Sequence, residues 1–348
     1  MEELKTLPKV AVIILNYNGQ KNLGSLLNEA IESALNQTYF NTEVVFADNG
    51  SDDRSVEHVT KKYGDKIRVV ALGKNYGFCL GNNLASKHIS PNTKYLLFQN
   101  PDAVLSGEYT EKLVSLMETN QTIGVAQGLE VMHDGRRVIG GLVSIFGVNY
   151  DVELEESDVR SLISRNVRVL YADGSGMIVR KELFDKVGGF SPELFMYYDE
   201  MDLCCRVLCL GFGTVGTLAA SYNHKLGGTV VSNREKMRAG YFYYRNRWLI
   251  IIRYFPRKFL LQSFMEFFAE LLINARSARA RSSLYFGLVS YLVKNLRTEL
   301  RIRNSYRKVQ KLMVNYAIPT PLPLKYNKAN VAGFMTKHGF WLEKFGST

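Results

Sequence analysis

The first two hundred residues alternate short apolar runs with stretches of helical spacing, and this alternation limits the fold of the chain more than any other feature. Short apolar runs with the character of buried strands occupy residues 10–15, 43–47, 67–71 and 95–98. Stretches with helical spacing lie in residues 23–37 and 55–63, whereas residues 73–83 are expected to form a loop. Strands that alternate with helices predict an α/β layer fold.

Polar residues gather where these apolar runs end. Asn18, Asp48 and Asn75 follow the first three runs, and Asp102 follows the fourth. In open α/β sheets, ligands bind in the crevice outside the carboxyl ends of the strands. We therefore expect these side chains to converge on one site. Pro101 stiffens the turn that carries Asp102, which favours this carboxylate as a metal ligand.

The charge of the chain is unevenly distributed. Residues 1–224 hold 21 Lys and Arg and 28 Asp and Glu, a balance of −7. Residues 225–348 hold the remaining 44 − 21 = 23 basic and 33 − 28 = 5 acidic residues, a balance of +18. A basic tail of this kind predicts a polyanionic partner, either an anionic membrane or nucleic acid. Signatures of nucleic-acid-binding modules are missing from the sequence, so we expect no nucleic acid as partner.

From about residue 241 the chain becomes rich in aromatic residues, Leu and Arg. Residues 249–252, 259–274 and 278–303 have the character of amphipathic helices with basic polar faces, which is typical of an interfacial membrane anchor. One alternative is a helical subdomain that packs on the α/β core. Another is that the tail pairs with a second copy of the chain, forming a homo-oligomer.

Targeting and cysteine signals are weak. The four cysteines have neither the spacing of a disulfide framework nor that of a zinc site, and no secretory signal precedes the first apolar run. No stretch reaches the roughly 18 apolar residues of a spanning helix. We therefore expect a cytoplasmic protein, peripheral on the inner face of the cell membrane.

Three carboxylates crowd into four residues at Asp199, Glu200 and Asp202, between aromatic residues and an apolar helical run. Crowding and partial burial raise the pKa of at least one of them, as a general base requires. The alternative is a helix N-terminus, where the helix dipole favours acidic residues. The two interpretations are compatible, because a catalytic acid can stand at the start of a helix.

His224 precedes a glycine-rich segment and follows this acidic cluster, so it is a candidate metal ligand or, alternatively, a structural histidine. Residues 211–216 match the dinucleotide-binding pattern G-x-G-x-x-G. That pattern requires a strand before it and a helix after it. Here a helical run comes first and a strand-like segment follows, so we interpret these glycines as a helix end and a turn.

Taken in order, these segments resemble family 2 of the inverting glycosyltransferases with the GT-A fold, and within it the rhamnosyltransferase-like branch. The similarity extends over about residues 10–250. It rests on the segments 10–19, 48–53, 75–78 with 81–83, 100–103, 174–176, 187–190, 199–206 and on His224. The resemblance implies a Rossmann-like mixed sheet flanked by helices over residues 1–240, followed by a basic helical region over residues 241–348.

The resemblance also implies roles for individual residues. Asp48 would contact the nucleobase, and the nucleoside would lie near Asn18 and three residues of the following loop, namely Asn75, Gly77 and Asn82. Asp102 corresponds to the last acid of the family's DxD motif, and Asn100 replaces the first. Asp102 would therefore hold Mn²⁺ or Mg²⁺ with help from His224. Gly174 and Ser175 would lie on the acceptor side.

The branch usually carries Glu-Asp-x-Asp-Leu at the base, where this chain has Asp199-Glu200-Met201-Asp202-Leu203. Glu200 takes the base position, with Asp199 as the alternative. The implied activity moves a sugar from a UDP- or dTDP-sugar to a hydroxyl of a glycan or lipid-linked glycan, with inversion. The competing hypothesis is a non-catalytic scaffold that binds sugar nucleotides and carries a basic tail for a membrane or nucleic acid.

Overall fold

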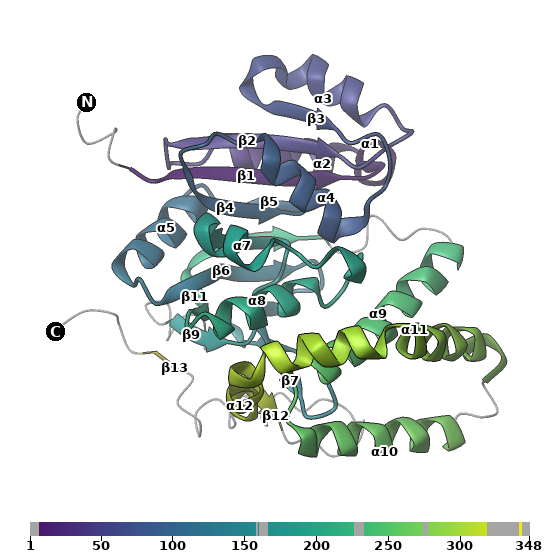
Figure 1. Ribbon diagram of the computed structural model, residues 1–348. Helices are drawn as coiled ribbons and strands as arrows, with labels where there is room; N and C mark the ends of the chain where they lie inside the picture. Colours follow the sequence, from purple (N-terminus) through teal and green to yellow (C-terminus); the bar gives the residue numbers. More distant parts are fainter. Residues whose placement is uncertain are drawn as a thin grey trace.

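A central mixed β-sheet organises the protein in the computed structural model (Figure 1), which describes residues 7–157, 159, 166–225, 233–273, 278–318 and 341–342. The strand order is β13-β9-β11-β6-β10-β4-β1-β2-β3, with β5, β7, β8 and β12 attached beside this path. The strands are β1 (Lys9–Asn16), β2 (Thr42–Asp48), β3 (Arg68–Ala71), β4 (Thr93–Gln99), β5 (Ala103–Leu105), β6 (Ile123–Met132), β7 (Arg137–Ser144), β8 (Asn149–Glu153), β9 (Asn166–Val169), β10 (Gly176–Arg180), β11 (Gly213–His224), β12 (Ala317–Ile318) and β13 (Trp341–Leu342).

Helices cover both faces of the sheet. They are α1 (Gly19–Leu23), α2 (Ser25–Leu35), α3 (Ser55–Tyr63), α4 (Gly77–Ala85), α5 (Tyr109–Thr119), α7 (Lys181–Val187), α8 (Asp199–Cys209), α9 (Asn233–Tyr254), α10 (Arg257–Ile273), α11 (Ala278–Ser305) and α12 (Arg307–Tyr316). Short 3₁₀ turns add Gly64–Lys66, Ser86–His88 and Pro192–Leu194. The predicted α/β layer fold is confirmed.

The sequence of β1 explains why the sheet is covered on both sides. Successive side chains of a strand point to opposite faces. Ala11 and Ile13 belong to one buried cluster, while Val10, Val12 and Ile14 belong to the other. A continuous apolar run is therefore what a strand buried on both faces requires. Strand β1 pairs in parallel with both β2 and β4, so the polar residues that follow these strands emerge at one edge of the sheet.

The expected loop over residues 73–83 is wrong in part, because helix α4 begins at Gly77. The glycines that suggested a loop are needed for close packing instead. A Cβ atom at Gly81 would lie 2.8 Å from Leu15 Cδ2, so only glycine lets α4 approach β1 this closely. The pattern at residues 211–216 is confirmed as the end of α8 followed by β11.

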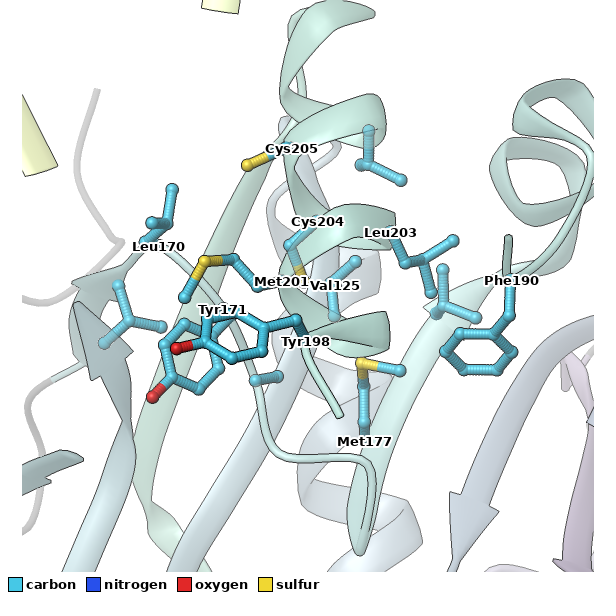
Figure 2. Packing of buried hydrophobic residues seen from close by; sticks show 14 of the residues in the cluster. Val125, Leu170, Tyr171, Met177, Phe190, Tyr198, Met201, Leu203, Cys204 and Cys205 are labelled. Carbon is cyan, nitrogen blue, oxygen red and sulfur yellow. The ribbon is translucent and has the colours of Figure 1, made fainter. Parts of the chain in front are cut away.

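Helix α8 is fixed by its apolar face. Figure 2 shows Met201 and Cys204 of α8 beside Val125 of β6, and all three side chains are at most 1% exposed. Cys205 is buried as well, and all four cysteines of the chain are free. Since this face packs against the sheet, the acidic residues at the start of α8 are held in place at the edge of the core.

The C-terminal helices pack on the core of the sheet through part of their surface. Figure 1 shows α9 to α12 grouped beside β7, far from β3. Trp248 and Leu249 of α9, Phe259 of α10 and Val309 of α12 belong to the same buried cluster as the sheet, and Tyr291 and Leu292 of α11 pack against it. The core-packing alternative is therefore correct for the inner faces of these helices. The predicted boundary between residues 240 and 241 falls inside α9, and the division into two domains stays a prediction. Among the helices that the structure describes, none has the length and hydropathy needed to cross a bilayer.

Candidate functional site

A cavity of about 520 Å³ opens at the sheet edge where β1 and β4 end. It is lined by Leu15, Asn16, Tyr17, Leu23, Asn49, Asn75, Gly77, Phe78, Asn100, Pro101, Asp102, Asp173, Gly174, Ser175, Phe195, Met196, Tyr197, Asp199, Glu200, His224, Arg238 and Ala239. Eight of the residues predicted from the sequence are among them: Asn75, Gly77, Asp102, Gly174, Ser175, Asp199, Glu200 and His224. The lining thus combines carboxylates with amides and aromatic rings.

His224 and Asp102 meet in the wall of the cavity. Strand β11 pairs with β5 so that His224 lies opposite Ala103, which brings the imidazole next to Asp102. The distance from His224 Nε2 to Asp102 Oδ1 is 3.2 Å, and His224 Nδ1 lies 2.6 Å from Glu130 Oε1. Asn100 Nδ2 lies 3.4 Å from the same Nε2. The imidazole is thus held between two carboxylates, one on each ring nitrogen.

Burial and hydrogen bonding have opposite effects on the pKa values of His224 and Glu130. Burial lowers the pKa of His224, but the hydrogen bonds to Asp102 and Glu130 outweigh it and raise the pKa to about 10. Burial, together with the nearby charge of Asp173, raises the pKa of Glu130 to about 7, although its hydrogen bond with His224 opposes this. The site therefore has an excess of negative charge that a cation can neutralise.

The donor set suits a divalent cation. One ligand atom each from Glu130, Asp173 and His224 lies within 4.8 Å of the others, and Asp102 contacts the same imidazole. Glu130 Oε2 is buried without a hydrogen-bond partner. Two or three carboxylates with one imidazole can hold Mn²⁺ or Mg²⁺, and the nitrogen ligand is more favourable for Mn²⁺. The predicted pair of Asp102 and His224 is brought together here.

Glu130 and Asp173 were missed from the sequence. Glu130 lies in an apolar run that forms β6, and it is 1% exposed. A carboxylate inside a buried strand is costly unless it has a partner, which is a usable signal of a site. Asp173 comes directly before the glycines of residues 174–176, where its carboxylate accepts a hydrogen bond from Ser175 N at 2.8 Å.

The second acidic group stands at the start of α8. Asp199 and Glu200 are its first two residues, and both line the cavity. Burial raises the pKa of Asp199, and burial together with the charge of Asp199 raises the pKa of Glu200 well above its usual range. The two side chains are hydrogen-bonded to each other. A pair with raised pKa values that faces a cavity has the properties of a general base.

Asp202 does not line this cavity. Its carboxylate is fully buried and accepts hydrogen bonds from Ser191 Oγ at 2.7 Å and Tyr254 Oη at 2.7 Å. Arg206 and Arg253 form ion pairs with it at 2.7 and 3.2 Å. Burial alone would raise the pKa of Asp202, but the two guanidinium groups lower it. The carboxylate predicted as catalytic is therefore enclosed by partners that join α8 to α9, without access to a substrate.

Three of the predicted donor-side residues, Asp48, Asn18 and Asn82, are not among the residues that line the cavity. Asp48 accepts hydrogen bonds from Asn16 Nδ2 at 3.0 Å and Ser51 Oγ at 2.6 Å. Asn18 accepts from the backbone of Asp52, and Asn82 donates to Phe78 O at 3.1 Å. Asp48 and Asn18 thus stabilise the turns that follow β1 and β2, whereas the hydrogen bond of Asn82 lies within α4. Asn16 and Asn49, which the sequence did not single out, do reach the cavity from this side.

Arg238 is another residue that the sequence did not reveal. Among the described residues that line the cavity, it is the only arginine or lysine. Its guanidinium carbon lies 4.6 Å from the centre of the Phe195 ring. A cation held over an aromatic ring in the wall of an acidic cavity can contact an anionic part of a ligand.

Comparison with known proteins agrees with this geometry. The model described as "Glycosyl transferase family 2" matches residues 11–188, and the model described as "Glycosyl transferase family group 2" matches residues 100–317. One relative is the low-salt glycan biosynthesis hexosyltransferase Agl10 of Haloferax volcanii, 23% identical over 70% of this chain and 75% of its own length. The dTDP-rhamnosyl transferase RfbF of Shigella flexneri is 24% identical over 59% of this chain and 64% of its own length.

Other matches are partial. A glycosyltransferase of Haemophilus influenzae, described as uncharacterized, is 29% identical over 34% of this chain, and the match spans 36% of its own length. Among solved structures, GalNAc-T7 with UDP, GalNAc and Mn²⁺ superposes with a TM-score of 0.57 at 14% identity, over 74% of this chain and 51% of that one. At this identity the likeness concerns the fold alone, and it agrees with the predicted GT-A architecture.

Proposed function

This chain belongs to glycosyl transferase family 2, and we propose that it transfers a sugar from a UDP- or dTDP-sugar to a hydroxyl group of a glycan or lipid-linked glycan, with inversion at the anomeric carbon. The main support is one cavity whose lining includes both a candidate cation-binding pair, Asp102 with His224, and the paired acids Asp199 and Glu200. The names of RfbF and of the GalNAc-T7 complex support dTDP and UDP as the donor nucleotides.

The proposed reaction is a single displacement. Glu200 removes the proton of the acceptor hydroxyl while that oxygen attacks the anomeric carbon, and the bond from this carbon to the diphosphate breaks. A Mn²⁺ or Mg²⁺ ion held by Asp102, Asp173 and His224 would neutralise the diphosphate leaving group. Positive charge develops on the sugar ring in the transition state, so the negative charge of ionised Asp199 is favourable there.

The remaining predicted residues receive supporting roles in this proposal. Asn75 and Gly77 face the nucleoside, Asp48 and Asn18 stabilise the turns around it, and Asn82 stabilises α4. Gly174 and Ser175 lie on the acceptor side. Asp202 positions α8 through its ion pairs with Arg206 and Arg253 and does not take part in proton transfer.

A screen of nucleotide sugars tests the proposal. In the presence of Mn²⁺, a donor at 100 times its Kd stabilises the fold by about 2.7 kcal/mol and raises Tm on the order of 5 °C. We expect a UDP- or dTDP-sugar to give this shift and to release the nucleoside diphosphate, both effects being lost with a chelator. A scaffold without activity would show the shift but no release. Absence of any shift would contradict the proposal.

We also propose that the protein attaches to the anionic inner face of the cell membrane through α11. Val289, Val293, Leu296 and Leu300 are between 45% and 74% exposed and follow the spacing i, i+4, i+7, i+11 along one face of this helix. Exposed Lys294, Arg297 and Arg301 alternate with this stripe. Apolar residues that enter the lipid boundary and basic residues that contact its headgroups form the pattern of an interfacial helix. On α10, Leu261 and Met265 are also exposed, each to 66%.

Binding to vesicles tests this attachment. The protein should sediment with vesicles rich in phosphatidylglycerol, less so at high salt, and not with phosphatidylcholine alone. Reversing two charges, K294E with R297E, should weaken binding about tenfold or more, because each basic residue contributes about 1 kcal/mol at such a surface. V293D should also weaken it, whereas V314D, at an exposed valine of α12, serves as the matched control. Unchanged vesicle binding by V293D would contradict the proposal. So would a result in which V293D dissociates a dimer while vesicle binding stays the same.

A further inference from the structure

The turn that leads into α8 has an unusual backbone. Phe195, Tyr197 and Tyr198 have φ values of 65°, 67° and 62°, and only two other non-glycine residues in the described part of the chain have positive φ. Side chains of L residues disfavour this conformation, so something outside the turn must hold it. The turn ends at Asp199, so its shape sets the direction in which Asp199 and Glu200 leave the core.

Asn246 of α9 donates hydrogen bonds to the backbone of this turn. Its side-chain amide nitrogen lies 2.9 Å from Leu194 O, 2.8 Å from Met196 O and 2.9 Å from Tyr197 O. Asn246 is completely buried, so the backbone carbonyls have no water to replace this donor. The two N–H groups of one amide thus serve three carbonyls of residues 194–197, with one N–H shared between two of them.

Arg245 orients that amide. Its Nε and Nη2 donate to Asn246 Oδ1 at 2.9 and 2.8 Å, which leaves the NH₂ group facing the turn. The same guanidinium donates to Glu193 O and, at 3.1 Å, to Leu194 O. It also lies 4.8 Å from the centre of the Phe242 ring, which limits its movement. Arg245 and Asn246 therefore form one rigid clasp on residues 193–197.

The clasped turn also contacts the donor side of the cavity. Phe195 O accepts hydrogen bonds from Phe78 N at 2.7 Å and Cys79 N at 3.2 Å, in the first turn of α4. A Cβ at Gly77 would lie 2.6 Å from this carbonyl, so the two segments are in direct contact. The position of the turn is thus shared by the acids at the start of α8 and by the segment that carries Asn75 and Gly77.

We propose that Arg245 and Asn246 are positioning residues for glycosyl transfer, which hold the left-handed turn so that Asp199 and Glu200 face the acceptor. Neither residue lines the cavity, so they act through the turn and not on the substrate. This inference rests on the proposed function, since it concerns the same reaction. It assigns the basic, aromatic segment at the centre of α9 a role in catalysis, separate from any role in membrane attachment.

The substitution N246A tests the clasp. We expect kcat to fall about 100-fold, because a displacement of about 1 Å at a reacting group can have this effect, while the donor KM changes far less. The matched control is N295A in α11, which removes a similar amide contact, Asn295 Nδ2 to Tyr291 O at 2.9 Å, away from the turn. N246D keeps the size of the side chain but loses the donor, so it should resemble N246A. Equal kcat values for N246A and N295A would overturn the inference.

A second variant distinguishes a change in the shape of the turn from a loss of folding of the whole protein. Glycine accepts positive φ without strain, so Y197G should reduce the dependence of the turn on Asn246. The fold-loss of kcat that N246A causes should therefore be smaller in the Y197G background than in the unaltered chain. If N246A alone does not fold, recovery of folded protein in N246A/Y197G supports the clasp, and failure to recover it contradicts the clasp.

The proposed function is tested separately by donor turnover of the unaltered chain. If no donor is turned over, the glycosyl-transfer proposal fails regardless of Asn246. Hydrogen exchange of the amides in residues 193–198 then still tests the clasp, because N246A should accelerate their exchange and N295A should not. Unchanged exchange in N246A would show that the turn holds its shape without Asn246.

Discussion

Replacing Glu200 by glutamine is expected to lower kcat by about 10²–10⁴-fold, the range that a general base contributes. Glutamine has nearly the same shape and keeps a hydrogen-bonding oxygen, but it cannot take up the proton of the acceptor. Glu200 lines the cavity but lies outside the group around His224 that could hold the cation, so donor binding should change little by comparison. Single-turnover release of nucleoside diphosphate, measured alongside donor affinity, checks this. E182Q, at an exposed position of α7, is the matched control.

The neighbouring substitution D199N decides which of the two acids is the base. A base must be ionised, so kcat/KM rises with pH through its pKa. The negative charge of Asp199 raises the pKa of Glu200, and removing it lowers that pKa. D199N should therefore move the rise in kcat/KM to lower pH while activity persists. If instead D199N shows the large loss and E200Q only shifts the profile, Asp199 is the base.

Much of the sheet could be predicted because the sequence pattern that indicates each strand lies within the strand itself. The runs that became β1, β2 and β4 are apolar on consecutive residues and are followed by Asn or Asp, as expected for strands covered on both faces. Helix α4 was missed because Gly77 and Gly81 suggest a loop when seen alone. These glycines instead allow contact with Phe195 and Leu15, which are distant in the sequence.

The site was predictable only in part for a related reason. Asp102 and His224 follow recognisable segments, but Glu130 reaches His224 through the pairing of β6 with β11, across 94 residues. Among the three acids of residues 199–202, the sequence did contain one unused clue. Asp202 has Arg206 four residues later, the spacing of an ion pair on one helix face, and the structure forms that pair in the core. Such a partner marks a structural carboxylate.

Helix α9 shows that the composition of a segment does not by itself reveal its contacts in the fold. Its aromatic and basic residues suggested a membrane anchor, yet Asn246 is fully buried and Arg245 nearly so. Both bind Leu194 O, 52 and 51 residues earlier in the chain. No periodicity within α9 could reveal this contact, because a hydrogen bond to a carbonyl depends on the fold and not on the identity of the residue that carries it.

Replacing Asp102 by asparagine should have the second large effect, on the binding of the cation. Asparagine keeps the shape of the side chain but loses the charge that attracts Mn²⁺, so affinity for Mn²⁺ should fall by about 100-fold or more. Donor binding should lose its dependence on Mn²⁺ to the same extent, since in the proposed reaction the diphosphate and the protein share the ion. Titration of Mn²⁺ with and without UDP or dTDP measures both quantities. D134N, at the exposed turn between β6 and β7, is the control.

Glu130 provides a graded comparison for the same measurement. Its carboxylate lies 2.6 Å from His224 Nδ1, on the side of the ring away from Asp102. If it acts by fixing the imidazole so that Nε2 faces the ion, E130Q should weaken Mn²⁺ binding by about 10–100-fold, less than D102N. A larger loss in E130Q than in D102N would make Glu130 the principal ligand. Wild-type affinity in D102N would remove Asp102 from the metal site, and the cation would then have to be held by Glu130, Asp173 and His224 alone.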